Sequence, residues 1–212
     1  MNGQVKVISF DVEGTIVTTD FSYAIWFEMI PRLYANRHNL ELSLALDKVK
    51  QEYNSLGDQC PEWYDVQYWF TRFDLGRADI AMEELQNRVH YYPETEDVLG
   101  NLGRKFRLSV ASGSPHQFLR QLLRNLDHHF NAIFSSISDF NNVKTADFYM
   151  EVCRQLEVLP EQVVHVGDNL RFDYYEPRSI GIRSYYLDRE GISGVPGALG
   201  SLTQLIDLLD GS

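Results

Sequence analysis

The sequence predicts an α/β protein: a Rossmann-like parallel sheet with helices on both faces, plus an α-helical cap inserted after the first strand. After residue 93, short apolar segments alternate with helical ones, and another short apolar segment lies near the start of the chain. Alternating strands and helices imply right-handed crossovers, which produce a parallel sheet covered on both faces. Between residues 18 and 92 the strand pattern is absent, and apolar residues recur three and four positions apart instead.

The first strand is expected at VKVISF, residues 5–10, an apolar run that ends at Asp11. Segments of helical periodicity follow, and all three tryptophans lie among them. The expected helices are 21–38, 42–53, 61–73 and 78–92. Because the first strand belongs with the later ones, the helices form an insertion rather than an N-terminal domain. The predicted division is a core of residues 1–17 and 93–212, and a cap of residues 18–92.

The chain after Pro93 supplies the rest of the core. The expected elements are a helix at 95–105, a strand at 107–111, a helix from Pro115, a strand at 132–137, a helix at 146–156, a strand at 163–166, a helix near 174–180, a strand at 183–187 and a final helix at 202–209. Open parallel sheets bind ligands at the carboxyl ends of their strands. The residues that follow each strand are therefore the candidates for function.

The charge balance disfavours several classes of partner. The 212 residues include 19 Lys and Arg against 30 Asp and Glu, which gives a formal net charge of −11. A surface this negative repels phosphate backbones and anionic lipid, and no run of basic residues provides a local patch. We therefore expect neither nucleic-acid nor membrane binding. A small anion can still bind where a metal ion or backbone N–H groups reverse the local field.

The two cysteines indicate a reducing compartment, and the apolar runs are too short for a signal peptide or a membrane span. Cys60 and Cys153 are far apart and form no C-x-x-C pair, so a disulfide framework or a thiolate zinc site is not expected. The first ten residues lack the pattern of a signal peptide, and no stretch has the roughly 18 consecutive apolar residues of a membrane span. The expected location is cytoplasmic, and the sequence leaves open whether the protein is a monomer or a homodimer.

Polar residues follow four of the expected strands. They are Asp11, Glu13, Ser112, Lys144, Asp168, Asn169 and Asp173, with Gly14 and Gly113 in the same loops. Taken one at a time, several have a structural alternative: Asp11 could cap a turn, Ser112 could lie in a helix N-cap, and Lys144 could be a surface lysine. Their joint placement at successive strand ends favours a functional interpretation.

The residue types suggest phosphoryl transfer. A carboxylate can act as a nucleophile, and one or two carboxylates together with a phosphate bind Mg²⁺. A hydroxyl and a lysine can hold the other phosphate oxygens and neutralise developing charge. A second acid near the leaving group can donate a proton and later activate water.

The same residues match a known family. SFDVEGTIV, residues 9–17, is similar to the motif D-x-D-G-T-[LI]-[VL], and VVHVGDNLRFD, residues 163–173, to G-D-x-x-x-x-D. Ser112 and Lys144 match the two intervening motifs. The chain thus resembles the haloacid dehalogenase (HAD) superfamily across its whole core. Its helical insertion is similar to the cap that some members carry between the first two motifs.

The resemblance implies a role for each matched residue. Asp11 would be the nucleophile that attacks phosphorus, and Ser112 and Lys144 would hold the transferring phosphoryl group. The Asp11 carboxylate, the backbone carbonyl of Glu13 and Asp168 would hold Mg²⁺. Asp173 would lie in the outer metal shell or position the metal's ligands.

Three further residues complete the predicted site. Gly14 permits a backbone conformation at the turn that β-branched residues avoid. Gly14, Gly113 and Asn169 are expected beside the bound phosphate or substrate.

Glu13 departs from the usual pattern. Most phosphatases of this superfamily have Asp there as the general acid and base, whereas the dehalogenases have a non-acidic residue and need no metal. Glu keeps the acid but moves the carboxyl outward by ~1–1.5 Å. The superfamily's enolase-phosphatases also carry D-x-E-G-T, so Glu is compatible with phosphatase chemistry, although the rest of the match to them is poor.

The cap is expected to recognise the leaving group. Its aromatic residues are expected mainly to form its own small core, and the sequence does not choose which of Tyr23, Trp63 or Tyr64 faces the site. The arginines of the cap, Arg32, Arg37 and Arg72, could anchor a second anionic group, although solvated faces are their expected place. His165, within the strand VVHV, is expected to be a buried histidine with hydrogen-bond partners.

The predicted function is a Mg²⁺-dependent phosphatase that acts on a small phosphorylated metabolite, a phosphomonoester, through an aspartyl-phosphate intermediate. Two alternatives stay open. One is a phosphomutase or phosphotransferase of the same superfamily, in which a substrate hydroxyl replaces water as the acceptor. The other is a catalytically weak HAD-like binding protein.

Overall fold

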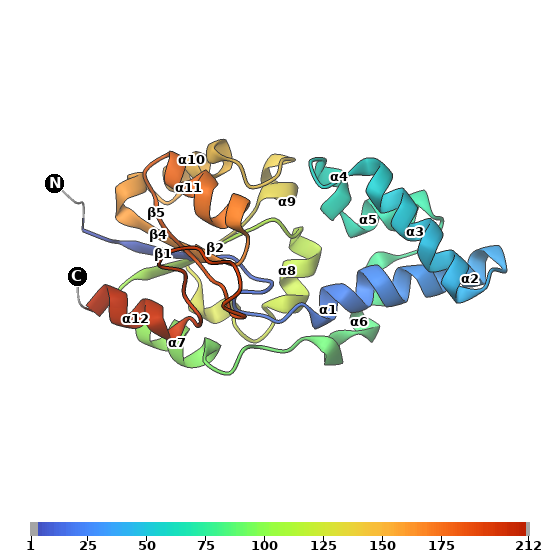
Figure 1. The fold of residues 1–212 in the computed structure, drawn as a ribbon, viewed down its shortest axis with the longest axis horizontal. Coiled ribbons are helices and arrows are strands. Elements are labelled where there is room, and N and C mark those ends of the chain that lie inside the picture. The colour runs from blue at the N-terminus through green and yellow to red at the C-terminus, as the bar shows by residue number, and fades with distance from the viewer. Residues whose placement is uncertain (1–3, 211–212) are drawn as a thin grey trace.

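The core of the protein is a five-stranded parallel sheet, seen in a computed structural model that describes residues 4–210 (Figure 1). The strands are β1 (Val7–Phe10), β2 (Arg107–Ser112), β3 (Ala132–Ser135), β4 (Val163–Gly167) and β5 (Arg183–Tyr186). Their order is β3-β2-β1-β4-β5, and every neighbouring pair is parallel. Strand β1 is central and fully buried, which explains why its sequence is a continuous apolar run rather than an alternating one.

The register of the sheet brings the predicted strand ends to one edge. Phe10 of β1 lies beside Val110 of β2 and Val166 of β4. Asp11 therefore leaves the sheet close to the ends of both neighbouring strands. Strand order and register together make this edge the place where the candidate residues converge.

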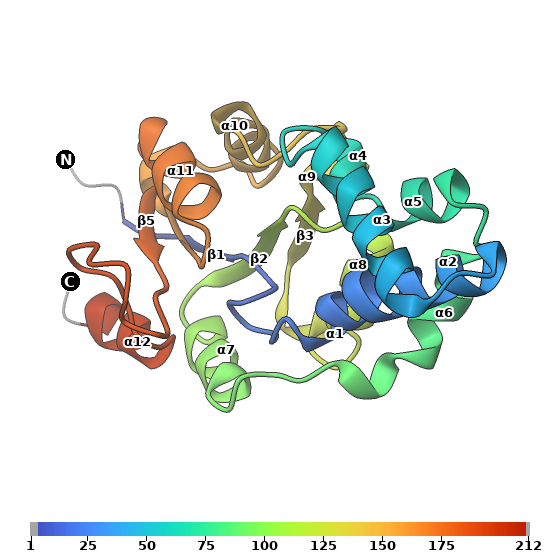
Figure 2. The same ribbon diagram turned by 45° about the vertical axis from the view of Figure 1, so that its right-hand side comes forward.

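Helices cover both faces of the sheet, as the alternating pattern predicts. Helices α10 (Ala146–Gln155) and α11 (Glu176–Ser179) lie on one face, and α7 (Thr95–Gly103) and α12 (Thr203–Asp210) lie on the other (Figures 1 and 2). Apolar side chains of α7 and α12 pack into one buried cluster with β1, and those of α10 pack into a second. The predicted Rossmann-like α/β fold is confirmed.

Several elements differ from their predicted bounds; the helix expected at 78–92, for example, ends at Glu84. In three further cases a polar side chain that caps a helix is the reason. The strand expected at 132–137 ends at Ser135, whose hydroxyl accepts a hydrogen bond from the backbone N–H of Ser138 and begins helix α9 (Ser136–Phe140). The helix expected near 174–180 begins earlier, as the π-helix η5 (Leu170–Tyr175), whose N-cap is Asn169. The helix expected at 61–73 breaks at Asp65 into α4 (Pro61–Tyr64) and α5 (Val66–Arg72).

Residues 20–88, between β1 and α7, form a helical segment that lies to one side of the sheet (Figures 1 and 2). Its first three elements run without a break as α1 (Asp20–Tyr23), the π-helix η1 (Ala24–Met29) and α2 (Ile30–His38). They are followed by α3 (Leu42–Leu56), α4, α5, α6 (Ala78–Glu84) and the 3₁₀ helix η2 (Gln86–Arg88). Remaining core elements are α8 (His116–Leu122) and the 3₁₀ helices η3 (Asp127–His129) and η4 (Pro160–Gln162).

Aromatic packing holds these helices together. The Trp69 side chain is fully buried, and its ring centroid lies 4.6 Å from that of Tyr53 and 5.4 Å from that of Phe73. Most of the aromatic pattern is therefore this segment's own packing, as expected from its helical spacing.

The chain enters the helical segment near residues 17–18 and leaves it near residues 90–91, and these two stretches lie side by side. The Thr18 N–H donates to the His90 carbonyl at 2.8 Å, and Val17 and Tyr91 form an antiparallel bridge. The division of the chain into a core and a cap remains a prediction. Between residues 4 and 210, no helix has both the length and the apolar character to cross a membrane.

Candidate active site

A cavity of about 310 Å³ lies at the carboxyl ends of β1, β2 and β4. Eight of the nine predicted site residues line it, namely Asp11, Glu13, Ser112, Gly113, Lys144, Asp168, Asn169 and Asp173. The helical segment closes another side with Thr19, Ser22, Trp26, Trp63 and Tyr64. Residues predicted from separate strand ends thus share one cavity with side chains of the segment between β1 and β2.

Lys144 joins two of the predicted carboxylates. Its ammonium donates to Asp11 Oδ1 at 2.6 Å and also to Asp173 Oδ1, and all three side chains are buried. Burial alone would lower the pKa of Lys144, but the charges of Asp11 and Asp173 outweigh it and raise that pKa above its ordinary value. Lys144 is therefore a charged group at the centre of the site, and the alternative of a surface lysine is wrong.

Asp173 is held from several directions. Besides Lys144, its Oδ1 lies 3.1 Å from His165 Nε2, and its Oδ2 accepts from the Asn169 N–H at 2.9 Å. Burial would raise the pKa of Asp173, but Lys144 and His165 keep it below its usual range. His165 is fully buried and also lies 3.1 Å from Ser9 Oγ, so the expectation of a buried histidine with hydrogen-bond partners is confirmed.

Asp11, Asp168 and Asp173 offer carboxylate oxygens that all lie within 4.8 Å of one another. The single positive charge of Lys144 cannot neutralise three carboxylates. Burial raises the pKa of Asp11 well above its ordinary value, with Lys144 opposing and the neighbouring acids adding to the effect. The side chain of Asp168 is accessible from the cavity, yet desolvation and the charge of Asp173 raise its pKa to about 6. The cluster thus has a surplus of negative charge that a cation would relieve.

The Glu13 carboxylate has its hydrogen bond outside this cluster of acids. Its Oε2 accepts a hydrogen bond of 2.6 Å from the Ser114 hydroxyl. Its Oε1 is buried and has no hydrogen-bond partner among the described residues, since the nearby Ser22 hydroxyl donates to the Thr19 carbonyl. Burial raises the pKa of Glu13, and the hydrogen bond from Ser114 opposes that shift. The longer side chain therefore reaches a serine beyond the end of β2.

Two glycines leave room for the acids. Gly14 has a φ of +73°, and a Cβ there would lie 2.0 Å from Asp168 Oδ2. A Cβ on Gly167 would lie 2.3 Å from Asp173 Cγ. Gly14 does not line the cavity, but it permits the approach of Asp168 to the first loop.

The remaining predicted residues have mainly local partners. The Ser112 hydroxyl accepts from the Ser114 N–H at 3.1 Å. Asn169 Oδ1 accepts from the N–H groups of Arg171 and Phe172, which begins η5. Gly113 lies on the cavity wall between the two serines.

Sequence reasoning missed three residues that support the site. Ser114 follows β2 and bonds Glu13, yet its sequence context assigns it no role of its own. The Tyr149 hydroxyl, from α10, donates to the Phe172 carbonyl at 2.8 Å and lies 3.3 Å from Asp173 Oδ1. Arg189 donates to the carbonyls of the loop after β1, at 2.7 Å for Thr15. Two of the three come from elements with no motif of their own, so no local pattern could have identified them.

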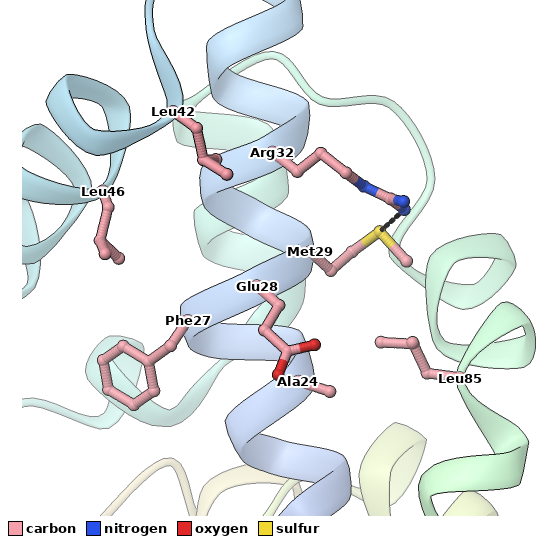
Figure 3. A pocket seen from close by; sticks show the side chains of 8 residues that line it. All are labelled: Ala24, Phe27, Glu28, Met29, Arg32, Leu42, Leu46 and Leu85. Atoms are coloured by element: carbon pink, nitrogen blue, oxygen red, sulfur yellow. Dashed lines mark hydrogen bonds between the residues drawn. The ribbon is translucent and has the colours of Figure 1, made fainter.

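A second cavity, of about 290 Å³, lies within the helical segment (Figure 3). Aliphatic side chains such as Leu42, Leu46 and Leu85 form most of its wall. Glu28 and Arg32 are its charged residues, and the Arg32 guanidinium points to the Met29 sulfur at 3.1 Å. With a single carboxylate and no candidate nucleophile beside it, this cavity lacks the groups for phosphoryl transfer.

Comparison with known proteins agrees with this geometry. The model of a family described as haloacid dehalogenase-like hydrolase matches residues 5–178. A glyceraldehyde 3-phosphate phosphatase of Pyrococcus furiosus is 23% identical over 98% of this chain and 94% of its own length.

Two solved structures share the fold over nearly their whole lengths. An HAD phosphatase from Thermococcus onnurineus has a TM-score of 0.87 at 24% identity, covering 98% of this chain and 99% of its own. A 2-haloacid dehalogenase from Pseudomonas syringae pv. Tomato DC3000 has a TM-score of 0.72 at 21% identity, with the same coverage of both chains.

Proposed function

The chain belongs to the haloacid dehalogenase-like hydrolase family, and from that premise we propose that this phosphatase cleaves a small phosphomonoester through a covalent phosphate on Asp11. The family membership confirms the resemblance inferred from the motifs. The observation that carries the proposal is the buried Asp11–Lys144–Asp173 network with Asp168 beside it. In this proposal one edge of the sheet, where β1, β2 and β4 end, holds three kinds of group. They are the nucleophile, the cation that binds the phosphate and the carboxylates that bind the metal.

The acids of this edge fit Mg²⁺. Carboxylate oxygens of Asp11, Asp168 and Asp173 lie close together, and a single ammonium leaves their charge in excess. Asp11 and Asp168 would hold the ion together with the backbone carbonyl of Glu13, while Asp173, already bonded to Lys144 and Asn169, would position them. When bound, the ion would neutralise negative charge on the transferring phosphoryl group.

Asp11 is the proposed nucleophile. Lys144 engages its Oδ1, which leaves Oδ2 to attack phosphorus, and the strand fixes the carboxylate at the floor of the cavity. The Ser112 hydroxyl and the Lys144 ammonium would hold the phosphoryl oxygens, with Gly113 and Asn169 on the adjoining wall. Fixed donors of this kind stabilise the charge that spreads over those oxygens in the transition state.

Glu13 is the proposed acid and base. Ser114 fixes one oxygen of its carboxyl group, and the other, Oε1, has no hydrogen-bond partner among the described residues. Glu13 would protonate the leaving oxygen as the bond to phosphorus breaks, and would then remove a proton from the water that hydrolyses the aspartyl phosphate. The acid at position 13 favours phosphatase chemistry over dehalogenation.

The curated relative supports a phosphorylated substrate. The Pyrococcus furiosus protein is named a glyceraldehyde 3-phosphate phosphatase and matches nearly the whole of this chain. We propose a metabolite-sized phosphomonoester for this enzyme without transferring that particular compound.

The test is release of phosphate from p-nitrophenyl phosphate by the purified protein. We expect hydrolysis with Mg²⁺, loss of activity on chelation, and recovery when Mg²⁺ is restored in excess. Hydrolysis that survives exhaustive chelation would contradict the metal-dependent mechanism. Failure to hydrolyse any phosphomonoester in the presence of Mg²⁺ would contradict the phosphatase proposal.

A further inference from the structure

The active-site cavity has an unusual balance of charge. Its lining contains four carboxylates, of Asp11, Glu13, Asp168 and Asp173, and one cation, Lys144. Among its described lining residues there is no arginine, no histidine and no second lysine. Lys144 is already bonded to two of the acids. The positive charge available is thus concentrated where the phosphoryl group would bind.

The arginines of the helical segment do not supply a second anion site. Arg37 and Arg72 form ion pairs with Asp74 and Glu52. Arg32 lies in the other cavity, turned to the Met29 sulfur. The sequence-based candidates for a second anionic group therefore all lie outside the active-site cavity.

Arg171 also lies outside it. Its guanidinium donates to Gln59 Oε1 at 2.6 Å and lies 3.7 Å from Glu176. These contacts hold the start of η5 against the loop before α4. Arg171 is therefore not among the residues that line the cavity.

A large part of the remaining cavity lining is apolar. Trp63 and Tyr64 come from α4, and Ile137 comes from α9, which packs against α4. Val143 and Phe172 extend this wall. A carbon skeleton with no charge can bury its surface against these side chains, whereas a second carboxylate or phosphate would lose hydration there without gaining a partner.

One buried polar group interrupts the apolar wall. The Ser136 side chain is fully buried, and its hydroxyl has no hydrogen-bond partner among the described residues. It lies at the start of α9, directly before Ile137, and lines the cavity. Buried hydroxyls in folded proteins almost always have a partner, and Ser136 differs from the other unpaired hydroxyls of residues 4–210, those of Thr15, Ser109 and Thr145, in that it lines the cavity, where a hydroxyl or carbonyl of a substrate can reach it.

We propose, on the basis of the phosphatase function above, that the cavity selects phosphomonoesters whose leaving alcohol is uncharged and carries a further hydroxyl or carbonyl group. The uncharged skeleton lies against Trp63 and Tyr64, and its polar group bonds to Ser136. A second anionic group finds no cation on this wall once Lys144 and the proposed Mg²⁺ hold the phosphoryl group, and it loses its hydration there without compensation. The volume of about 310 Å³ is near the lower limit of small-molecule sites, roughly 300–1,000 Å³, which fits a compound of a few carbons.

Matched pairs of substrates test the selection by charge. Glycerol 3-phosphate and 3-phosphoglycerate share most of their skeleton, but the second has a carboxylate where the first has CH₂OH. Ethylene glycol monophosphate and phosphoglycolate form a second such pair. We expect kcat/KM to be about 30-fold or more higher for the uncharged member of each pair.

The outcomes separate this inference from the function on which it rests. If p-nitrophenyl phosphate is cleaved but both members of each pair react equally, or the carboxylate member reacts faster, the inference is wrong and the phosphatase proposal stands. If no phosphomonoester is cleaved, the function itself is wrong.

A variant tests the role of Ser136. In Ser136→Ala, the ratio of kcat/KM for glycerol 3-phosphate to that for p-nitrophenyl phosphate should fall about tenfold, since the latter has no hydroxyl on its leaving group. Ser138→Ala is the matched control, because Ser138 lies on the same helix, is exposed and does not line the cavity. An unchanged ratio in Ser136→Ala would contradict the assigned contact.

Discussion

Two cavities of nearly equal volume, about 310 and 290 Å³, differ in almost every other respect. The first lies where parallel strands end and gathers four carboxylates and a lysine from distant parts of the chain. The second lies between helices of one continuous segment and is walled largely by leucines and neighbouring apolar side chains (Figure 3).

The difference between them is one of topology rather than size. Parallel strands deliver the residues after β1, β2 and β4 to one edge, so polar groups separated by over a hundred positions meet. Helices of a single segment pack against one another through their apolar faces, so a space left between them is lined by apolar side chains. Chemistry is therefore expected in the first cavity, and changes in the second should affect stability alone.

The largest effect is expected from Asp11→Asn. The amide keeps the shape but is not a nucleophile, so kcat for p-nitrophenyl phosphate should fall about 10⁴-fold or more. Circular dichroism and thermal unfolding would establish that the variant is folded. Activity within tenfold of the unsubstituted protein would exclude Asp11 as the nucleophile.

A large effect on both stability and rate is expected from Lys144→Met. It leaves the carboxylates of Asp11 and Asp173 buried without their counter-ion, which should lower the free energy of unfolding by about 3–5 kcal/mol near neutral pH. The rate should fall by about 10²–10³-fold, because the phosphoryl group loses its cation. Urea unfolding and initial rates give the two values.

The control for this change is Lys48→Met, on an exposed position of α3. A surface substitution of this kind should change stability by no more than about 0.5 kcal/mol. Equal destabilisation by the two variants would mean that the buried network contributes nothing specific.

A smaller effect that depends on the substrate is expected from Glu13→Gln. For an alkyl phosphate, whose leaving oxygen needs a proton, kcat should fall about a hundredfold or more. For p-nitrophenyl phosphate, whose leaving group is stable as an anion, the loss in the first chemical step should be smaller. The diagnostic value is kcat/KM, which reports the steps up to release of the leaving alcohol, because kcat also includes the aspartyl-phosphate hydrolysis that both substrates share. The same loss of kcat/KM for both substrates would argue against Glu13 as the acid.

The smallest effect is expected in the second cavity. Leu85→Ala removes part of its wall and should lower the free energy of unfolding by about 1–2 kcal/mol, since Leu85 is only half-buried. Its kcat/KM for p-nitrophenyl phosphate should remain within about twofold. A loss of activity comparable to that of Glu13→Gln would show that the two cavities are not independent.

Much of the site could be predicted from local pattern. Asp11 and Asp168 each follow an apolar strand and Ser112 ends one, and the rule that parallel strands share an active edge is enough to group them at one site. Lys144 is predicted by its place in the loop before the helix expected at 146–156, and it lies between α9 and α10 in the structure. Such predictions succeed because they depend on strand direction, which sequence periodicity records.

The positions of several other residues in the site could not be predicted from the local sequence pattern. Tyr149 supports Asp173 from the buried face of α10, where its pattern is that of any core aromatic. The place of Ser136 on the cavity wall depends on where α9 begins, which a cap at Ser135 decides. The placement of Trp63 and Tyr64 depends on a helix break at Asp65 and on packing between distant segments.

The covalent intermediate is the most direct test of the central claim. Enzyme quenched in acid during turnover of a phosphomonoester, then digested and analysed by mass spectrometry, should carry one phosphate on Asp11. The label should be absent from Asp11→Asn. Phosphate on another residue, or turnover with no covalent phosphate under conditions that preserve acyl phosphates, would contradict the account.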